Sequence, residues 1–88
     1  MKVHVKLFAT LARIVSGPIL AQHPQGIRAG TPLEVELPKG STIADLVAYI
    51  GLPREELKLT FVNGRAQELD YCLERGDEVG IFPPVGGG

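Results

Sequence analysis

One segment of the chain has the apolar period of an amphipathic helix, and this limits the fold more than any other feature. Between residues 42 and 50, four apolar residues follow the i, i+3, i+4, i+7 spacing: Ile43, Leu46, Val47 and Ile50. Thr42 and Asp45 resemble a capping box at its start, and Gly51 and Pro53 close it. A lone amphipathic helix cannot bury its apolar face, so the remaining segments have to supply a second layer.

Alternating polar and apolar residues predict that this second layer is a β-sheet. Residues 2–8 and 33–37 alternate along their length, and residues 59–62 and 78–82 are apolar segments of strand length. Asn63-Gly64 is the strongest short hairpin signal and predicts a return strand from Arg65. The expected fold is α+β, a mixed sheet of four to five strands packed on one main helix in a roll of β-grasp type.

The segments between these elements predict less regular structure. Leu11, Ile14 and Val15 indicate a brief helix that Ser16-Gly17-Pro18 ends. Residues 18–32 are rich in Gly, Pro and Gln without a clean period, so we expect an extended, partly mobile loop there. The expected organisation is one domain in residues 1–82 and a C-terminal tail in residues 83–88.

Composition excludes several classes of protein. With 88 residues, 44% of them hydrophobic and 22% charged, the chain is expected to form one globular domain. Its single cysteine, Cys72, allows no internal disulfide, cysteine metal pair or iron–sulfur cluster, so a cytoplasmic protein with a buried structural cysteine is expected. No segment approaches the roughly 18 apolar residues of a membrane span, and no basic stripe with interleaved aromatics favours nucleic acid. No metal site is expected, and His4 and His23 are predicted to be surface residues.

Acidic residues concentrate shortly before the tail. They are Glu68, Asp70, Glu74, Asp77 and Glu78. A cluster of this sign beside the tail favours a partner whose surface is basic there. The alternative is a solvated acidic loop without a function.

The last six residues, Pro83-Pro84-Val85-Gly86-Gly87-Gly88, have the pattern of neither a strand nor a helix. The prolines stiffen the exit from the sheet, and glycines, which lack a Cβ atom, can lie extended in a channel too narrow for side chains. Such a tail suits insertion into another protein's active site, where an ATP-using partner can convert a terminal carboxylate to an acyl-adenylate. Sulfide can then displace AMP and leave a thiocarboxylate. The alternative is a frayed glycine end.

Residues 76–88 resemble the ending of the MoaD/ThiS family of sulfur carriers, typically G-D-E-V-x-x-F-P-P-V-x-G-G. The first strand with Leu7-Phe8-Ala9 and the hairpin at Val62-Asn63-Gly64 are also similar to the family, and only residues 18–32 look longer than usual. The resemblance implies a ubiquitin-like β-grasp fold with a flexible Gly-Gly tail. It places the adenylate and the thiocarboxylate on Gly88, with Gly87 as its companion.

Within the family, the chain most resembles the small subunit of molybdopterin synthase, because of its Phe-containing first strand and its Phe82-Pro83-Pro84-Val85 ending. This implies an E1-like adenylyltransferase of the MoeB/ThiF type and a large molybdopterin synthase subunit of the MoaE type as partners. The chain would then be a co-substrate and subunit of a sulfurtransferase in molybdenum cofactor biosynthesis, not a catalyst on its own. It would hold no permanent cofactor, since the activating partner uses the ATP and the sulfur is carried as the thiocarboxylate.

Other functions stay open at this point. Tails of this kind also serve thiamin, tungstopterin, cysteine and tRNA thiolation pathways. A ubiquitin-like protein modifier shares the activation chemistry and is not separated from a carrier by sequence. A plain β-grasp interaction module is a third class, against which the terminal Gly-Gly argues.

Two aromatic residues are candidates for partner docking. Phe8 and Phe82 have the opposite parity to the apolar residues of their strands, so both are predicted to face away from the helix and form an exposed patch beside the tail. The alternative is that the loop of residues 18–32 covers both rings. Phe61 fits either face, since a bulge after Lys58 would switch its parity. The predicted partner-binding residues are Phe8, Phe82, Pro83, Pro84, Val85 and Gly86.

Overall fold

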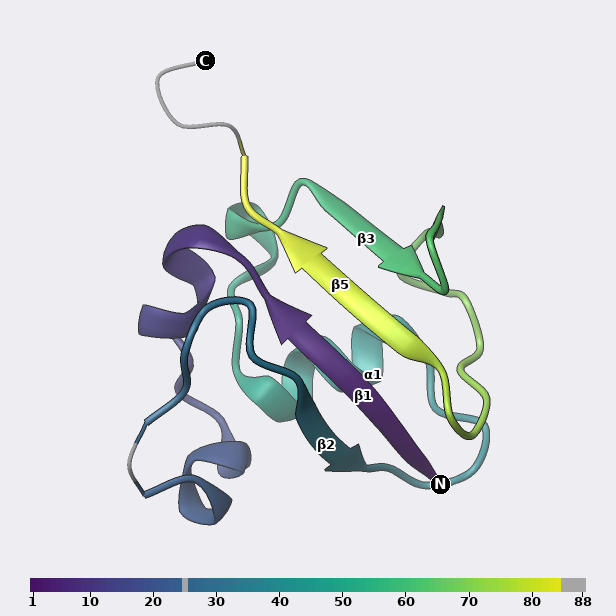
Figure 1. Cartoon of the computed structure of the whole chain (residues 1–88). Coiled ribbons are helices and arrows are strands. Elements are labelled where there is room, and N and C mark those ends of the chain that lie inside the picture. The colour runs from purple at the N-terminus through teal and green to yellow at the C-terminus, as the bar shows by residue number, and fades with distance from the viewer. Residues whose placement is uncertain (25, 85–88) are drawn as a thin grey trace.

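The structure is a computed structural model that describes residues 1–24 and 26–84. Figure 1 shows a twisted sheet whose five strands lie in the order β2-β1-β5-β3-β4. The strands are β1 (Lys2–Leu7), β2 (Leu33–Glu36), β3 (Leu59–Val62), β4 (Arg65–Ala66) and β5 (Glu78–Phe82). β1 and β5 pair in parallel at the centre, and all other neighbours pair antiparallel. The sheet is therefore mixed, as predicted.

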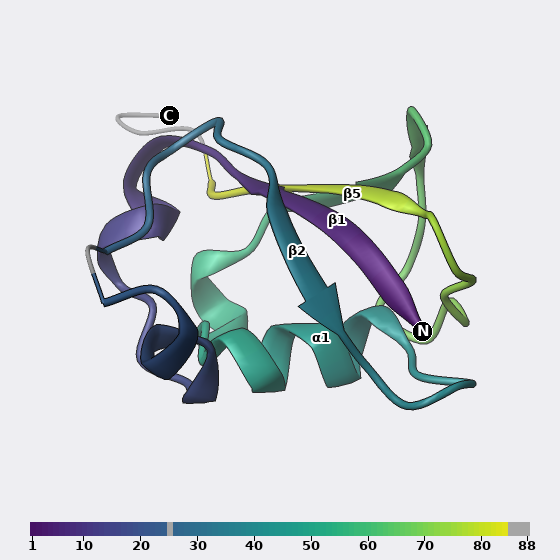
Figure 2. The same ribbon diagram turned by 60° about the horizontal axis from the view of Figure 1, so that its bottom comes forward.

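The predicted helix is α1 (Ile43–Ile50), which lies across one face of the sheet (Figure 2). Its start is the expected capping box: the Asp45 amide donates to Thr42 Oγ1 over 3.2 Å, and the Thr42 amide donates to Asp45 Oδ2 over 2.9 Å. Gly51 ends the helix with a left-handed φ of 82°, and its amide donates to the carbonyl of Val47. A mixed sheet packed on one main helix confirms the predicted α+β fold of β-grasp type.

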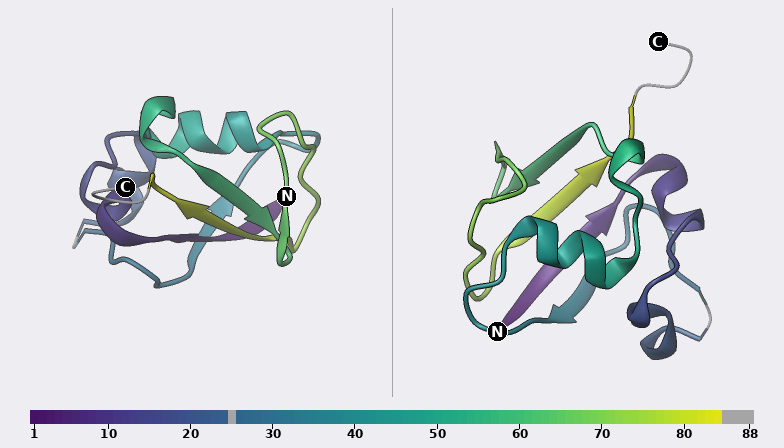
Figure 3. Two further views of the ribbon diagram at one scale, coloured as in Figure 1. Left: turned by 90° about the horizontal axis from the view of Figure 1, so that it is seen from above. Right: turned by 180° about the vertical axis from the view of Figure 1, so that it is seen from behind.

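The core lies between α1 and the sheet. All four apolar residues of the helical pattern are buried. The central and neighbouring strands contribute alternate residues to the same layer: Val3, Val5, Leu7, Val35, Val79 and Ile81. The left view of Figure 3 shows α1 on this side of the sheet, and in the described part of the chain the opposite sheet face carries no helix.

Residues 18–32 are only in part the loop that their composition predicted. Pro18–Gln22 form a 3-10 turn, η2, whose Ile19 is fully buried in the core. A second 3-10 turn, η1 (Ala9–Arg13), contains the predicted brief helix around Leu11. The large apolar residues of η2 are the neighbours Ile19 and Leu20, and two adjacent residues define no apolar period, which is why the sequence pattern did not reveal η2.

The segment before η2 is held against the C-terminal end of α1. The amide of Gly17 donates to the carbonyl of Ile50 over 2.9 Å, and Ser16 Oγ donates to the carbonyl of Gly51 over 3.0 Å. The right view of Figure 3 shows this segment beside the helix end. These bonds satisfy carbonyls that the helix cannot pair internally, so the segment is part of the folded body.

The hairpin prediction is confirmed, whereas the prediction for Cys72 is wrong. Asn63 and Gly64 both have positive φ, 52° and 85°, and turn β3 into the short β4. A third 3-10 turn, η3 (Arg54–Glu56), precedes β3. Cys72 is exposed rather than buried, because the next residue, Leu73, takes the core position along this alternating segment. Within the described residues, no helix has the length and apolar character that crossing a membrane requires.

Candidate functional site

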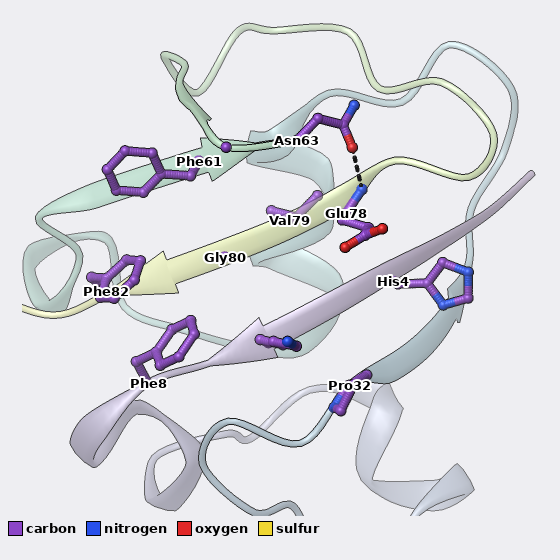
Figure 4. A pocket seen from close by; sticks show the side chains of 11 residues that line it. His4, Phe8, Pro32, Phe61, Asn63, Glu78, Val79, Gly80 and Phe82 are labelled. Atoms are coloured by element: carbon purple, nitrogen blue, oxygen red, sulfur yellow. Dashed lines mark hydrogen bonds between the residues drawn. The ribbon is translucent and has the colours of Figure 1, made fainter.

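The sheet face that α1 leaves uncovered carries the candidate site. β5 forms the middle of this open face, with β1 on one side and β3 on the other. The register places Lys6 of β1 and Phe61 of β3 opposite Gly80 of β5. Figure 4 shows the side chains that line a groove of about 940 Å³ on this face.

Three phenylalanines form an aromatic cluster at one end of the groove. The rings of Phe8 and Phe82 stack with centroids 4.3 Å apart and an interplanar angle of 3°, and Phe61 meets Phe82 edge-on at 5.5 Å and 84°. All three rings are only half-buried, so the residues that the structure describes do not cover them fully, and Pro32 is the described residue of 18–32 that lines the groove. The predicted placement of Phe8 and Phe82 away from the helix is confirmed, and Phe61 joins them on the open face.

Gly80 forms the floor of the groove next to this cluster. An ideal Cβ atom built on Gly80 would lie 3.4 Å from Cε2 of Phe8 and 3.6 Å from Cε1 of Phe82. These are ordinary van der Waals separations, so the two ring edges border the space that the missing side chain leaves open. Sequence reasoning did not select Gly80, although a glycine inside a strand, between Val79 and Ile81, is a recognised signal of close approach by another chain.

The charges on the open face are unevenly paired. Among the described residues, ion pairs join the Met1 ammonium to Glu36 at 2.9 Å and Lys2 to Glu34 at 3.4 Å. The exposed Lys6 has no carboxylate within ion-pair distance in this part of the chain. The half-buried His4 lies in register with Glu34 on one side and Glu78 on the other. Lys6 is therefore the uncompensated cation of the groove.

The acidic cluster lies only in part beside the tail. Glu78 begins β5 and Phe82 ends it, and the tail leaves from the Phe82 end (Figure 1). Four residue steps of about 3.3 Å separate the two ends by roughly 13 Å. The expectation is therefore wrong for Glu78, because an extended strand lies between it and the tail. Glu68 lies toward the tail end of the sheet, since it lines a pocket with Lys58 and Leu59, and Leu59 pairs with Phe82.

Asp77 is a structural member of that cluster. It is buried, and its carboxylate accepts hydrogen bonds from the Glu74 amide over 2.8 Å and from Asn63 Nδ2 over 3.0 Å. The Asn63 carbonyl oxygen, Oδ1, accepts from the Glu78 amide over 3.0 Å, a bond drawn in Figure 4. The Asp side chain therefore joins the β3–β4 turn to the start of β5 and is not available to a partner.

The tail begins beside the aromatic cluster. The carbonyl of Phe82 accepts from the Lys58 amide over 2.8 Å, which fixes the last residue of β5 in the sheet. Pro83 is half-buried and Pro84 is exposed. The remaining predicted site residues, Val85, Gly86, Gly87 and Gly88, lie outside the described residues.

The described residues contain no cluster typical of catalysis by the chain itself. Within them, no group of three or more His, Cys, Asp or Glu side chains is arranged to hold a metal ion. Cys72 and His23 lie outside the groove. What the geometry offers is an open, partly aromatic groove next to the point where the chain leaves the sheet.

These features define the class: a small β-grasp protein with an open aromatic face beside its C-terminal tail. Among solved structures, the "Putative molybdopterin converting factor, subunit 1" from Pyrococcus furiosus is 29% identical, with 97% of this chain and 99% of that chain covered and a TM-score of 0.66. SAMP1 from Haloferax volcanii is 24% identical with full coverage of both chains and a TM-score of 0.65, a likeness of fold. The Haloferax volcanii HVO 2177 protein is 21% identical over 100% of this chain and 87% of that chain, with a TM-score of 0.67.

The sequence pattern of the ThiS family matches residues 24–88, which is more than half of the chain. The chain therefore belongs to the ThiS family of ubiquitin-like sulfur carriers. A comparison with curated proteins gave no match.

Proposed function

We propose that the chain carries sulfur on the carboxylate of Gly88 and that its open sheet face docks the proteins that load and unload it. The observation that supports this best is the position of the tail. It leaves the sheet at Phe82, whose ring belongs to a half-exposed aromatic cluster. A partner that binds this cluster is thereby brought next to the residue from which the tail starts.

The chemistry of loading follows from the weakness of a free carboxylate as an acyl donor. A carboxylate oxygen of Gly88 attacks the α-phosphorus of ATP in the partner's active site, and pyrophosphate leaves. Hydrosulfide from a sulfur donor then attacks the acyl carbon of the adenylate, and AMP leaves with the bridging oxygen, which came from the Gly88 carboxylate. One proton is released, and the product is a terminal thiocarboxylate. The chain supplies a tail that enters the partner's active site, and the E1-like adenylyltransferase catalyses the reaction.

We propose further that the sulfur is delivered in molybdopterin synthesis, with this chain as the small subunit of the synthase. The 29% identity to a Pyrococcus furiosus protein described as a molybdopterin converting factor subunit supports this choice. The Phe82-Pro83-Pro84-Val85 ending supports it as well. The large subunit would receive the tail and take the sulfur from Gly88.

The test is the intact mass of the full chain after incubation with ATP, an E1-like adenylyltransferase and a sulfur donor. Exchange of one oxygen for sulfur raises the mass by about 16 Da, and fragmentation should map the gain to Gly88. Deletion of Gly88 should abolish the gain while circular dichroism stays unchanged, since the described core ends before it. A Leu20→Ser variant, changed at an exposed site away from the groove, is the matched control and should load normally.

Two results would count against the proposal. Undiminished loading after Gly88 deletion would show that the mass gain arises elsewhere. Isopeptide-linked products with lysines of other proteins, in place of a stable thiocarboxylate, would assign the chain to protein modification.

A further inference from the structure

The groove over Gly80 combines aromatic rings with the positive charge of Lys6, and this limits the kind of partner surface that can bind there. We propose that the docking partner places one apolar side chain over Gly80 and one carboxylate against Lys6. This inference rests on the proposed function, because it describes how the carrier is held while its tail is activated.

Gly80 has no conformational reason to be glycine. Its φ lies outside the left-handed region, and glycine inside a strand weakens a sheet because it packs no side chain. What Gly80 provides is space on the floor of the groove, bordered by the ring edges of Phe8 and Phe82 at 3.4 and 3.6 Å from an ideal Cβ. Phe61, opposite Gly80 on the neighbouring strand, lines the same groove farther away. An apolar side chain set there would meet aromatic carbon on both sides and replace water over exposed backbone.

Lys6 determines the sign of the charge that fits beside this apolar position. It lies opposite Gly80 in register, and no carboxylate in the described part of the chain pairs with it. Lys2, on the same face of β1, already pairs with Glu34 at 3.4 Å. Glu78, the acidic residue that lines the groove, is in register with His4 rather than with Lys6. A partner carboxylate at this rim gains a charge-assisted hydrogen bond, whereas a partner cation is repelled.

The position of the acidic residues strengthens the argument. The sequence favoured a basic partner surface beside the tail, but the acidic residue that lines the groove, Glu78, lies at the opposite end of β5 from Phe82. The charge in register with the groove floor near the aromatic cluster is Lys6. The complementary partner surface near the tail is therefore apolar and acidic.

The experiment measures binding of the full chain to a purified E1-like adenylyltransferase without ATP, so docking is read independently of loading. Lys6→Glu should weaken binding by about tenfold or more at low ionic strength, and Lys6→Gln by less. Lys39→Glu makes the same charge change at an exposed turn outside the groove and should stay within about twofold. Gly80→Val should weaken binding by about tenfold or more, with Gly80→Ala between it and the original chain.

Each outcome bears on one half of the proposal. If Lys6→Glu and Lys39→Glu weaken binding equally, the proposed contact between Lys6 and a partner carboxylate is refuted, because the change in net charge alone would explain the loss of affinity. If Gly80→Val folds and binds as the original chain does, the proposed partner side chain over Gly80 is refuted. If the valine disrupts folding, Gly80→Ala decides the point, since its Cβ fits at van der Waals distance.

Parallel mass measurements separate this inference from the proposed function. If the original chain gains no mass with a competent enzyme, the proposed function fails whatever the variants do. If the original chain is loaded and the groove variants bind as tightly as it does, only the present inference fails.

Discussion

Phe82 and Ile81 are neighbours on β5 whose side chains point to opposite faces, and together they test whether the open face is a docking surface. Phe82→Ala removes the ring that stacks on Phe8 at 4.3 Å and meets Phe61 at 5.5 Å. Each aromatic pair contributes about 0.5–1.5 kcal/mol beyond its buried area. Because Phe82 is only half-buried, we expect the free energy of unfolding to fall by about 1–3 kcal/mol, with the fold retained.

Two variants of the core residue Ile81 serve as controls, because one should lose less stability than Phe82→Ala and the other more. Ile81 is fully buried beneath α1. Ile81→Val should lower the free energy of unfolding by about 0.5–1.5 kcal/mol and Ile81→Ala by about 2–5 kcal/mol. Neither changes the open face, so both should bind the adenylyltransferase as the original chain does at a temperature where they are folded.

Urea unfolding followed by circular dichroism gives the stabilities, and calorimetry gives the dissociation constants. Phe82→Ala should weaken binding by about tenfold or more while its stability lies between those of the two Ile81 variants. The reasoning is refuted if Phe82→Ala binds like the original chain. It is also refuted if Ile81→Ala, measured while folded, loses as much affinity as Phe82→Ala, since affinity would then follow stability rather than the face that was changed.

Two further predictions concern the fold. A Cβ on Gly17 would overlap the carbonyl oxygen of Tyr49, so Gly17→Ala should lower the free energy of unfolding in urea by about 1–3 kcal/mol, although the φ of −87° at this position suits alanine. Gly40→Ala, which has open space but a φ of 90°, should lose only about 1 kcal/mol, and the opposite ranking would contradict the packing argument. The hydrogen bond and the charge of the Met1 ammonium lower the pKa of Glu36 below its usual 4.5. The ionised Glu36 side chain therefore stabilises the folded state above pH 4.5, and this contribution is lost as the pH falls through the lowered pKa. The difference in urea midpoint between Glu36→Gln and the original chain should therefore shrink below about pH 4.5, and a constant difference down to acid pH would exclude this linkage.

Local signals in the sequence predicted the elements that depend on neighbouring residues. The capping box of Thr42 and Asp45 marked the start of α1, and Asn63-Gly64 marked the hairpin. Parity placed Phe82 on the face away from the helix, because side chains alternate strictly along a strand. Each of these features is decided within a few residues of chain.

Features that depend on distant contacts were not predictable in the same way. Ile19 is buried because Gly17 brings its segment against the end of α1, a contact between residues more than thirty positions apart. The space over Gly80 depends on the rings of Phe8, which directly follows β1, and Phe82 of β5, and these meet only after the two strands pair in parallel. Cys72 was misjudged because its exposure is set by the isolated bridge to Thr42 and by the burial of Leu73 next to it.

The family motif in residues 76–88 combines two different physical roles, and the first one controls the second. The buried Asp77 and its bond to Asn63 fix where β5 begins against the β3–β4 turn. Because side chains alternate with a period of two, a slip of one residue in β5 would turn Phe82 into the core and Ile81 onto the open face. The tail would then start one residue away from the aromatic cluster. The acidic start of the motif thus sets the register that puts Phe82, and with it the origin of the tail, beside the proposed docking face.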